Sequence, residues 1–224
     1  MYQSIKQFAD YCDDNLDFSS RIDYGYKSLS VCILDCVYSL RAKYYAITVP
    51  IVDRYAYAFM DGDKQASGDT VSMLLARMET CGLERFASEI IKNHQVLGGS
   101  KKIPKEQVCY QLAKYLNALH IETLEDFQAF ESQEILEIVI RAVNGLGDAG
   151  VNYLFMLAGD PNRCKPDVHI HHCIRDAIGH SVTNEECQEI LSGATQLLRK
   201  RYPALTVREL DGIIWKKYQV GNSQ

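Results

Sequence analysis

The aspartate in the segment Lys165-Pro166-Asp167-Val168 is the residue best placed for chemistry. Pro166 disfavours a helical conformation in the residue before it, and aspartate is a preferred N-cap. The pattern therefore predicts a helix that begins at Val168 with Asp167 as its cap. A carboxylate can stabilise a developing positive charge or activate water. The alternative interpretation is structural, because an N-cap aspartate needs no other role.

A turn with two glycines lies twenty residues before this aspartate. Apolar residues with helical spacing precede it in 135–142 and follow it in 148–158, so the sequence predicts a helix, a short turn and a second helix. The turn is Asn144-Gly145-Leu146-Gly147. Its glycines permit positive φ and let backbone N–H groups at the start of the second helix approach an anion, for which a phosphate diester is the natural choice. The alternative is a turn that only joins two helices.

The hairpin, the helix after it and the segment Pro166-Asp167-Val168-His169-Ile170 together resemble the core of the endonuclease III and alkyladenine-glycosylase superfamily of helix-hairpin-helix DNA glycosylases. The resemblance covers residues 28–218 and is most specific over 135–178. It implies that Asp167 is the catalytic carboxylate. It also implies that the hairpin, as Asn144, Gly145, Leu146, Gly147 and Ala149, contacts DNA.

The resemblance implies a base pocket as well, because the reacting bond is reached only after the base leaves the stack. Tyr153 matches an aromatic residue that lines the pocket in alkyladenine-type members. Tyr38 and Ser39 lie where the wedge residue and a polar base contact often lie in the family. Packing in the core is the other interpretation of all three.

Two departures from the family pattern narrow the expected chemistry. Members that also cut the strand carry a nucleophilic lysine shortly after the second hairpin glycine, where this chain has Ala149. No cysteine follows Cys187, so the family's C-terminal iron–sulfur loop is absent. We therefore expect a glycosylase without lyase activity and without a cofactor.

A cluster of histidines and cysteines around residues 164–173 raises the question of a metal site. On a helix, His169 and Cys173 share a face, whereas His171 lies roughly opposite, so one tetrahedral site would require a broken helix. We expect no metal. Cys32 and Cys36, an i, i+4 pair that shares one face of a helix, are expected to pack in the core.

Composition points to an ordinary folded protein inside the cell. The chain has 224 residues, 47% of them hydrophobic, and no apolar run long enough to cross a membrane. Its first residues lack a secretory pattern, so an intracellular location and eight reduced cysteines are expected. The formal net charge of −5 argues against binding nucleic acid by bulk electrostatics. Binding through backbone N–H groups needs few cations.

The helical period dominates the chain and sustained strand-like alternation is absent, so the predicted fold is all-α. The resemblance implies two lobes with a cleft between them: a helical barrel over 28–160, and a second lobe formed by 1–27 and 161–224.

Thr183 with Glu186 and Thr206 with Glu209 fit capping boxes. Helices are predicted at 28–41, 43–60, 70–80, 84–95, 105–119, 123–130, 132–142, 148–158, 168–178, 184–200 and 207–218.

The sequence leaves three functions open. The first is a monofunctional DNA glycosylase, acting as a monomer on double-stranded DNA with a modified base and leaving an abasic site. The second is a non-catalytic helix-hairpin-helix protein that binds nucleic acid. The third is a structural helical protein in which the hairpin is only a turn. The base that the first would excise is not identified by the sequence.

Overall fold

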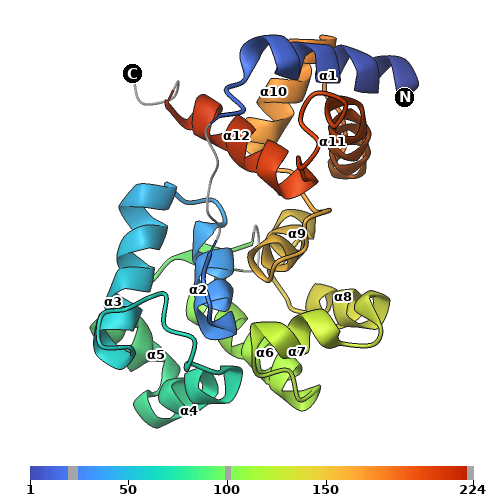
Figure 1. Ribbon diagram of the computed structural model, residues 1–224. Coiled ribbons are helices and arrows are strands. Elements are labelled where there is room, and N and C mark those ends of the chain that lie inside the picture. Colours follow the sequence, from blue (N-terminus) through green and yellow to red (C-terminus); the bar gives the residue numbers. More distant parts are fainter. Residues whose placement is uncertain (20–24, 99–101, 221–224) are drawn as a thin grey trace. The chain divides into compact units, whose positions relative to one another are not determined.

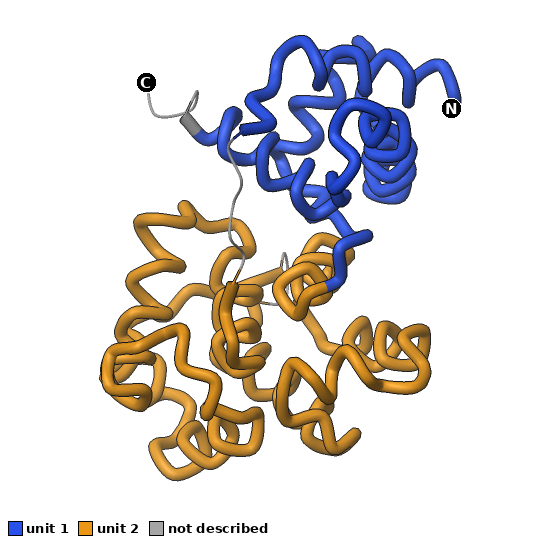
Figure 2. Tube along the Cα trace, viewed as in Figure 1, with its two compact units in different colours: residues 1–24, 160–224 blue, residues 25–159 orange. Residues whose placement is uncertain are grey.

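The computed structural model describes residues 1–19, 25–98 and 102–220. The protein is mostly helical, which confirms the predicted all-α class. It divides into two compact units (Figures 1 and 2): unit 1 comprises residues 1–24 and 160–224, and unit 2 comprises residues 25–159. None of the helices in the described ranges combines the length and apolarity needed to cross a lipid bilayer.

Unit 1 consists of four packed helices: α1 (Tyr2–Asn15), α10 (Val168–Ile178), α11 (Asn184–Leu198) and α12 (Val207–Val220). α1 packs on α10 and α11, and α12 packs on the same two helices. At Gly193 of α11, a Cβ atom would come within 2.7 Å of Ile5, so the absent side chain lets α1 approach closely. The core of this unit includes Phe8, Cys12, Ile170, Cys173, Ile174, Leu191, Leu210 and Ile214.

α1 was not among the predicted helices, although its sequence carries the signal. Ile5, Phe8, Ala9 and Cys12 are spaced by three and four residues, and the last three are buried. The capping box at Thr183 is confirmed, since Thr183 and Glu186 exchange side-chain-to-backbone hydrogen bonds. Thr206 and Glu209 form the same reciprocal pair at the start of α12.

Unit 2 is built around α2 (Leu29–Ser39), all of whose residues are buried. It contacts α3 (Val49–Phe59), α4 (Val71–Cys81), α6 (Lys105–Ala118) and α9 (Asp148–Leu157). A helix with no exposed residue belongs at the centre of a unit, and α2 takes that place in Figure 1. The remaining helices are α5 (Leu83–Arg85), α7 (Leu124–Ala129) and α8 (Gln133–Arg141).

Two π-helical turns, η1 (Tyr44–Thr48) and η2 (Phe86–Ile90), interrupt segments that the apolar period predicts as continuous α-helix. In the segment 43–60, the amide of Val49 bonds to the carbonyl of Tyr44, five residues earlier. Pro50 follows at once and has no N–H group, so the usual i to i−4 pattern fails there. The second interruption ends the helical segment at Ile90, where the sequence predicts helix to 95.

A short antiparallel pair of strands, β1 (Val96–Leu97) and β2 (Ile103–Pro104), precedes α6 and was not predicted. Lys105 begins α6 and is 1% exposed. Its Nζ donates to the carbonyl oxygens of Tyr38 and Leu40, at 3.0 and 2.7 Å, and to Oε1 of Gln95. A buried ammonium thus binds carbonyl groups at the C-terminal end of α2, where a cation also suits the helix dipole.

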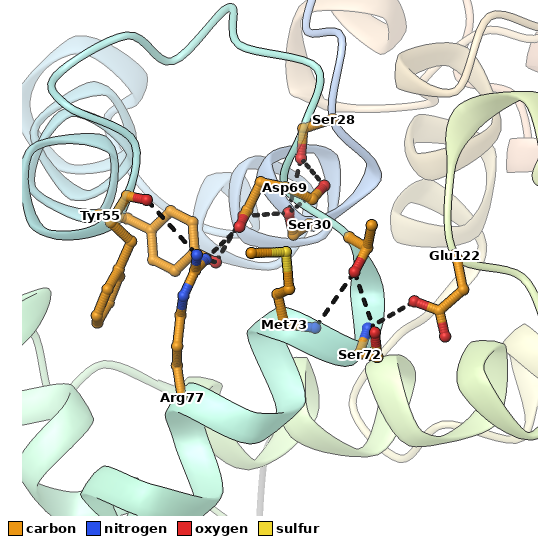
Figure 3. Close-up of polar contacts among 10 residues, drawn as sticks. Ser28, Ser30, Tyr55, Asp69, Ser72, Met73, Arg77 and Glu122 are labelled. Carbon is orange, nitrogen blue, oxygen red and sulfur yellow. Dashed lines mark hydrogen bonds and ion pairs between the residues drawn. The ribbon is translucent and has the colours of Figure 1, made fainter.

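The buried carboxylate of Asp69 joins α2, α3 and α4 (Figure 3). Oδ2 accepts hydrogen bonds from Ser30 Oγ at 2.5 Å and Tyr55 Oη at 2.8 Å, and Oδ1 forms an ion pair with Arg77. The guanidinium of Arg77 also donates to the Tyr55 hydroxyl. Burial, with the negative charge of Asp69, raises the pKa of Tyr55, which remains a neutral donor. This network is structural, because every group in it contacts another protein group.

Candidate functional site

The hairpin of unit 2 has the predicted arrangement of helix, turn and helix. Ser132 caps α8 by accepting a hydrogen bond from the amide of Ile135, and the helix ends at Arg141. α9 begins at Asp148, with Gly147 as an N-cap that has no side chain to offer. Asn144, Gly145 and Gly147 are exposed, whereas Leu146 is 4% exposed. The turn therefore anchors itself through Leu146 and presents backbone on either side.

The structure explains the two glycines of the turn differently. Gly145 has a φ of +93°, and a Cβ atom there would lie 3.3 Å from Val108 of α6. Gly147 has an extended backbone, and a Cβ atom there would meet nothing within 4 Å. Gly145 is thus required by the fold of the turn. Packing in the described protein gives no comparable reason for Gly147, which leaves open space beside the first N–H groups of α9.

Within the described residues, no group accepts a hydrogen bond from the amides of Gly147, Asp148 and Ala149. Such orphan N–H groups at a helix start form a site that attracts anions. The nearby charges are mixed, however. Arg141 forms ion pairs with both Glu137 and Asp148, so its charge is already compensated. Any anion bound here is therefore held mainly by backbone groups.

Tyr153, a predicted pocket residue, lies in a cluster of tyrosines that the sequence did not reveal. Its hydroxyl donates to Oδ1 of Asp35, at 2.8 Å, on the buried helix α2. Tyr26 and Tyr44 donate to Oδ2 of the same carboxylate, at 2.9 and 2.7 Å. Burial raises the pKa of Tyr26 and of Tyr44, and the charge of Asp35 adds to the effect. All three phenols are hydrogen-bond donors to one buried carboxylate.

Tyr38 and Ser39, the other predicted pocket residues, lie in the core of unit 2. Tyr38 is fully buried, and its hydroxyl has no hydrogen-bond partner among the described residues. Ser39 donates to the carbonyl oxygen of Cys36 within its own helix. This placement fits the interpretation of both residues as core packing, and a base contact by either would require a rearrangement of α2.

Asp167 is the N-cap of α10, as predicted. Its Oδ1 accepts hydrogen bonds from the backbone amides of His169 and Ile170, at 2.8 and 3.2 Å. No described residue contacts Oδ2 by a hydrogen bond, and the side chain is half-buried. The cap therefore fixes one oxygen of the carboxylate and leaves the other available. Asp167 lies in unit 1, whereas the hairpin and Tyr153 belong to unit 2.

Among the histidines and cysteines near Asp167, His171 lies beside Asn184 and Cys187, whereas Nδ1 of His169 is buried with no hydrogen-bond partner among the described residues. Nε2 of His171 lies 2.9 Å from Oδ1 of Asn184, and Sγ of Cys187 lies 3.5 Å from Nδ1 of the same histidine. Burial raises the pKa of Cys187 to about 12, so its thiol stays protonated and unreactive at neutral pH. No group of three or more acidic, histidine or cysteine side chains suited to a metal is found in the described ranges.

Comparison with known proteins places the chain in a family. No curated protein and no solved structure shows a significant match. A family model described as a domain of unknown function, DUF8548, matches residues 6–219. Because this match spans nearly the whole sequence, the chain belongs to the DUF8548 family.

Proposed function

We propose that this protein is a monofunctional DNA glycosylase with the two-lobed helix-hairpin-helix architecture, acting as a monomer on duplex DNA that contains a modified base. The observation that carries the proposal is the state of Asp167. One carboxylate oxygen is held by two amides, and no described residue forms a hydrogen bond with the other. A carboxylate fixed in this way can stabilise the oxocarbenium charge that develops on the sugar when the N-glycosidic bond breaks, and can orient the attacking water.

The hairpin supports the proposal by supplying a means of holding DNA. The unpartnered amides of Gly147, Asp148 and Ala149 match the chemistry of a phosphate diester, and Gly147 leaves room for it to approach. Such binding positions the duplex without reading its sequence. It also accommodates an acidic protein, because backbone donors do not depend on net charge.

The chemistry expected at the sugar is hydrolysis without strand cleavage. Strand cleavage by a glycosylase needs an amine that forms a Schiff base with the sugar, and Ala149 occupies the position where the resembling family carries that lysine. Water is then the nucleophile, and the product is an abasic site.

Release of a base from duplex DNA tests the proposal. The protein is incubated with duplexes carrying alkylated, oxidised or deaminated bases, and abasic sites are revealed as strand breaks after hot alkali. Asp167→Asn is the matched control, because asparagine caps a helix as well as aspartate does but carries no charge. We expect alkali-dependent breaks with the wild type and a loss of about 100-fold or more in the variant. Breaks without alkali would contradict the monofunctional assignment.

A non-catalytic DNA-binding protein is the second candidate. The observation that favours it is the state of the predicted pocket residues: the Tyr153 hydroxyl is engaged by Asp35, and Tyr38 is fully buried. The same assay separates the two functions. No released base, together with DNA binding that is lost in Gly147 variants, would support the binding protein. The absence of any DNA binding would exclude both.

A further inference from the structure

The loop that precedes Asp167 is held by two side chains from other helices, the buried Asp211 and the partly exposed Gln188. Residues 161–166, the presenting loop, have no regular secondary structure, so their backbone polar groups need other partners. The amide of Lys165 donates to Oδ2 of Asp211, on α12, at 2.8 Å. The amide of Cys164 donates to Oε1 of Gln188, on α11, at 3.0 Å. Two successive amides are thus fixed by side chains from two different helices.

Further contacts complete the attachment of this loop. Nε2 of Gln188 donates to the carbonyl oxygen of Asn162 at 2.8 Å, so one carboxamide binds the loop at two points. The amide of Arg208 donates to the carbonyl oxygen of Pro161 at 3.1 Å. Asp211 is 5% exposed, and Cys164 is fully buried. The acceptor of the Lys165 amide is therefore a buried carboxylate, and the amide of Cys164 belongs to a fully buried residue.

The position of the loop bears directly on Asp167. Only Pro166, whose ring fixes its own φ, separates Lys165 from the N-cap residue. The amides of His169 and Ile170 set the orientation of the Asp167 side chain, but they do not determine where the chain enters α10. The hydrogen bonds of Asp211 and Gln188 determine where the chain enters α10, because they hold the backbone at the positions two and three residues before Asp167.

We infer that Asp211 and Gln188 are positioning residues for the Asp167 carboxylate, fixing the presenting loop so that Oδ2 keeps its place relative to the reacting sugar. This inference rests on the proposed function. Misplacement of a reacting group by about 1 Å can reduce a rate by about 100-fold. Loss of the Lys165 hydrogen bond should therefore affect the chemical step far more than DNA binding.

The test compares Asp211→Ala, Asp211→Asn and Gln188→Ala with the wild type under single-turnover conditions. We expect excision to slow by about 10- to 100-fold in Asp211→Ala, with the Kd for duplex DNA changed by less than about twofold. Asp211→Asn retains an acceptor oxygen and should recover the rate to within about threefold of the wild type. Gln188→Ala should also slow excision while leaving the Kd unchanged.

The matched control is Thr195→Val, a buried α11 position whose hydroxyl, among the described residues, donates to the carbonyl oxygen of Leu191 alone. Thr195→Val should lose about as much thermal stability as Asp211→Ala does, but it should leave the excision rate unchanged. Amide hydrogen exchange supplies a measurement that does not need activity: exchange over 162–167 should accelerate at least tenfold in Asp211→Ala and stay slow in Thr195→Val. An active wild type with an equally active, folded Asp211→Ala would overturn this inference alone. A wild type that releases no base would overturn the proposed function and the catalytic part of the inference, while unaccelerated exchange would overturn the attachment of the loop.

Discussion

Glu106, in the first turn of α6, is a carboxylate that the fold leaves poorly satisfied. It is 8% exposed, and its Oε2 is buried without a hydrogen-bond partner among the described residues. Burial raises its pKa above the ordinary value, so the folded state favours the protonated form. The hydroxyl of Tyr38 is unpartnered in the same unit. These are costs that neighbouring packing in unit 2 must offset.

The raised pKa of Glu106 predicts a pH dependence of stability with a definite sign. Between its unfolded pKa, near 4.3, and its higher folded pKa, the folded state binds more protons than the unfolded state, so stability falls as pH rises. Glu106→Gln removes this titration. We expect the variant to be more stable than the wild type at pH 7, and the difference to disappear near pH 4. Urea unfolding of both proteins at several pH values measures it, and a constant difference would contradict the assignment.

The residues of the candidate site differ in how well the sequence predicts them. Asp167 as a cap follows from local signals: a proline before it and an apolar helical pattern after it. The tyrosine cluster around Asp35 does not, because Tyr153 lies 118 positions from Asp35 in the sequence and meets it only through tertiary packing. Asp211 and Gln188 were missed for the same reason. Their targets are backbone amides, which leave no mark on the sequence.

At the scale of elements, the period of apolar residues predicts long helices well and interruptions poorly. α2, α6 and α11 follow their predicted ranges to within a few residues, because the apolar period runs through each of them. Pro104 marks the start of α6, and the capping box at Thr183 marks the start of α11. The π-turns η1 and η2 depend on which carbonyl each amide reaches, which the apolar period does not encode. The strands β1 and β2 are two residues long, too short for an alternating pattern to appear.

The hairpin glycines should separate folding from binding. Gly145→Ala places a side chain at positive φ, 3.3 Å from Val108, and should destabilise the protein by about 1 to 2 kcal/mol. Gly147→Ala meets no atom within 4 Å and should leave the midpoint of thermal unfolding nearly unchanged. It should nevertheless weaken DNA binding, because its methyl group occupies the space next to the amides of α9.

Melting curves and a filter-binding assay on the same duplex measure both effects. Gly62→Ala is the control, with positive φ and open space in the same unit but no place in the hairpin. It should lose some stability and keep its DNA affinity. Normal binding by folded Gly147→Ala would argue against a phosphate at this turn.

The Asp69 network should dominate the stability of unit 2, because it joins three helices through one buried charge. Asp69→Ala leaves Arg77 and two hydroxyls without their acceptor and should cost about 3 to 5 kcal/mol. Exposed Asp53, which pairs with Lys64, provides the contrast: Asp53→Ala should cost less than about 1 kcal/mol. Denaturant unfolding of both variants checks the comparison, and equal losses would show that the buried network is not specially important.

For the whole molecule, the net charge of −5 constrains how DNA can be held. Exposed Arg41 and Lys43 follow α2, and the side chain of Leu40 would lie 3.3 Å from a Cβ atom on Gly150, in the first turn of α9. The backbone that carries these two cations therefore passes near the first turn of α9, whose first amides have no acceptor among the described residues. We expect them to supplement backbone binding of DNA.

DNA affinity should consequently depend only weakly on salt. Each phosphate neutralised by a cation contributes about 0.9 to the slope of log K against log salt, whereas a neutral N–H group contributes little. With Arg41 and Lys43 as the main cations, the slope should be about −2. The double variant Arg41→Glu, Lys43→Glu should bring the slope closer to zero and weaken DNA binding. The control Arg85→Glu, which alters an exposed ion pair with Glu89, should change neither the slope nor the affinity. Titrations of one undamaged duplex from 50 to 200 mM salt give the slope. A value near −8 would mean that an extended cationic surface holds the DNA, and that the hairpin amides are not the principal contact.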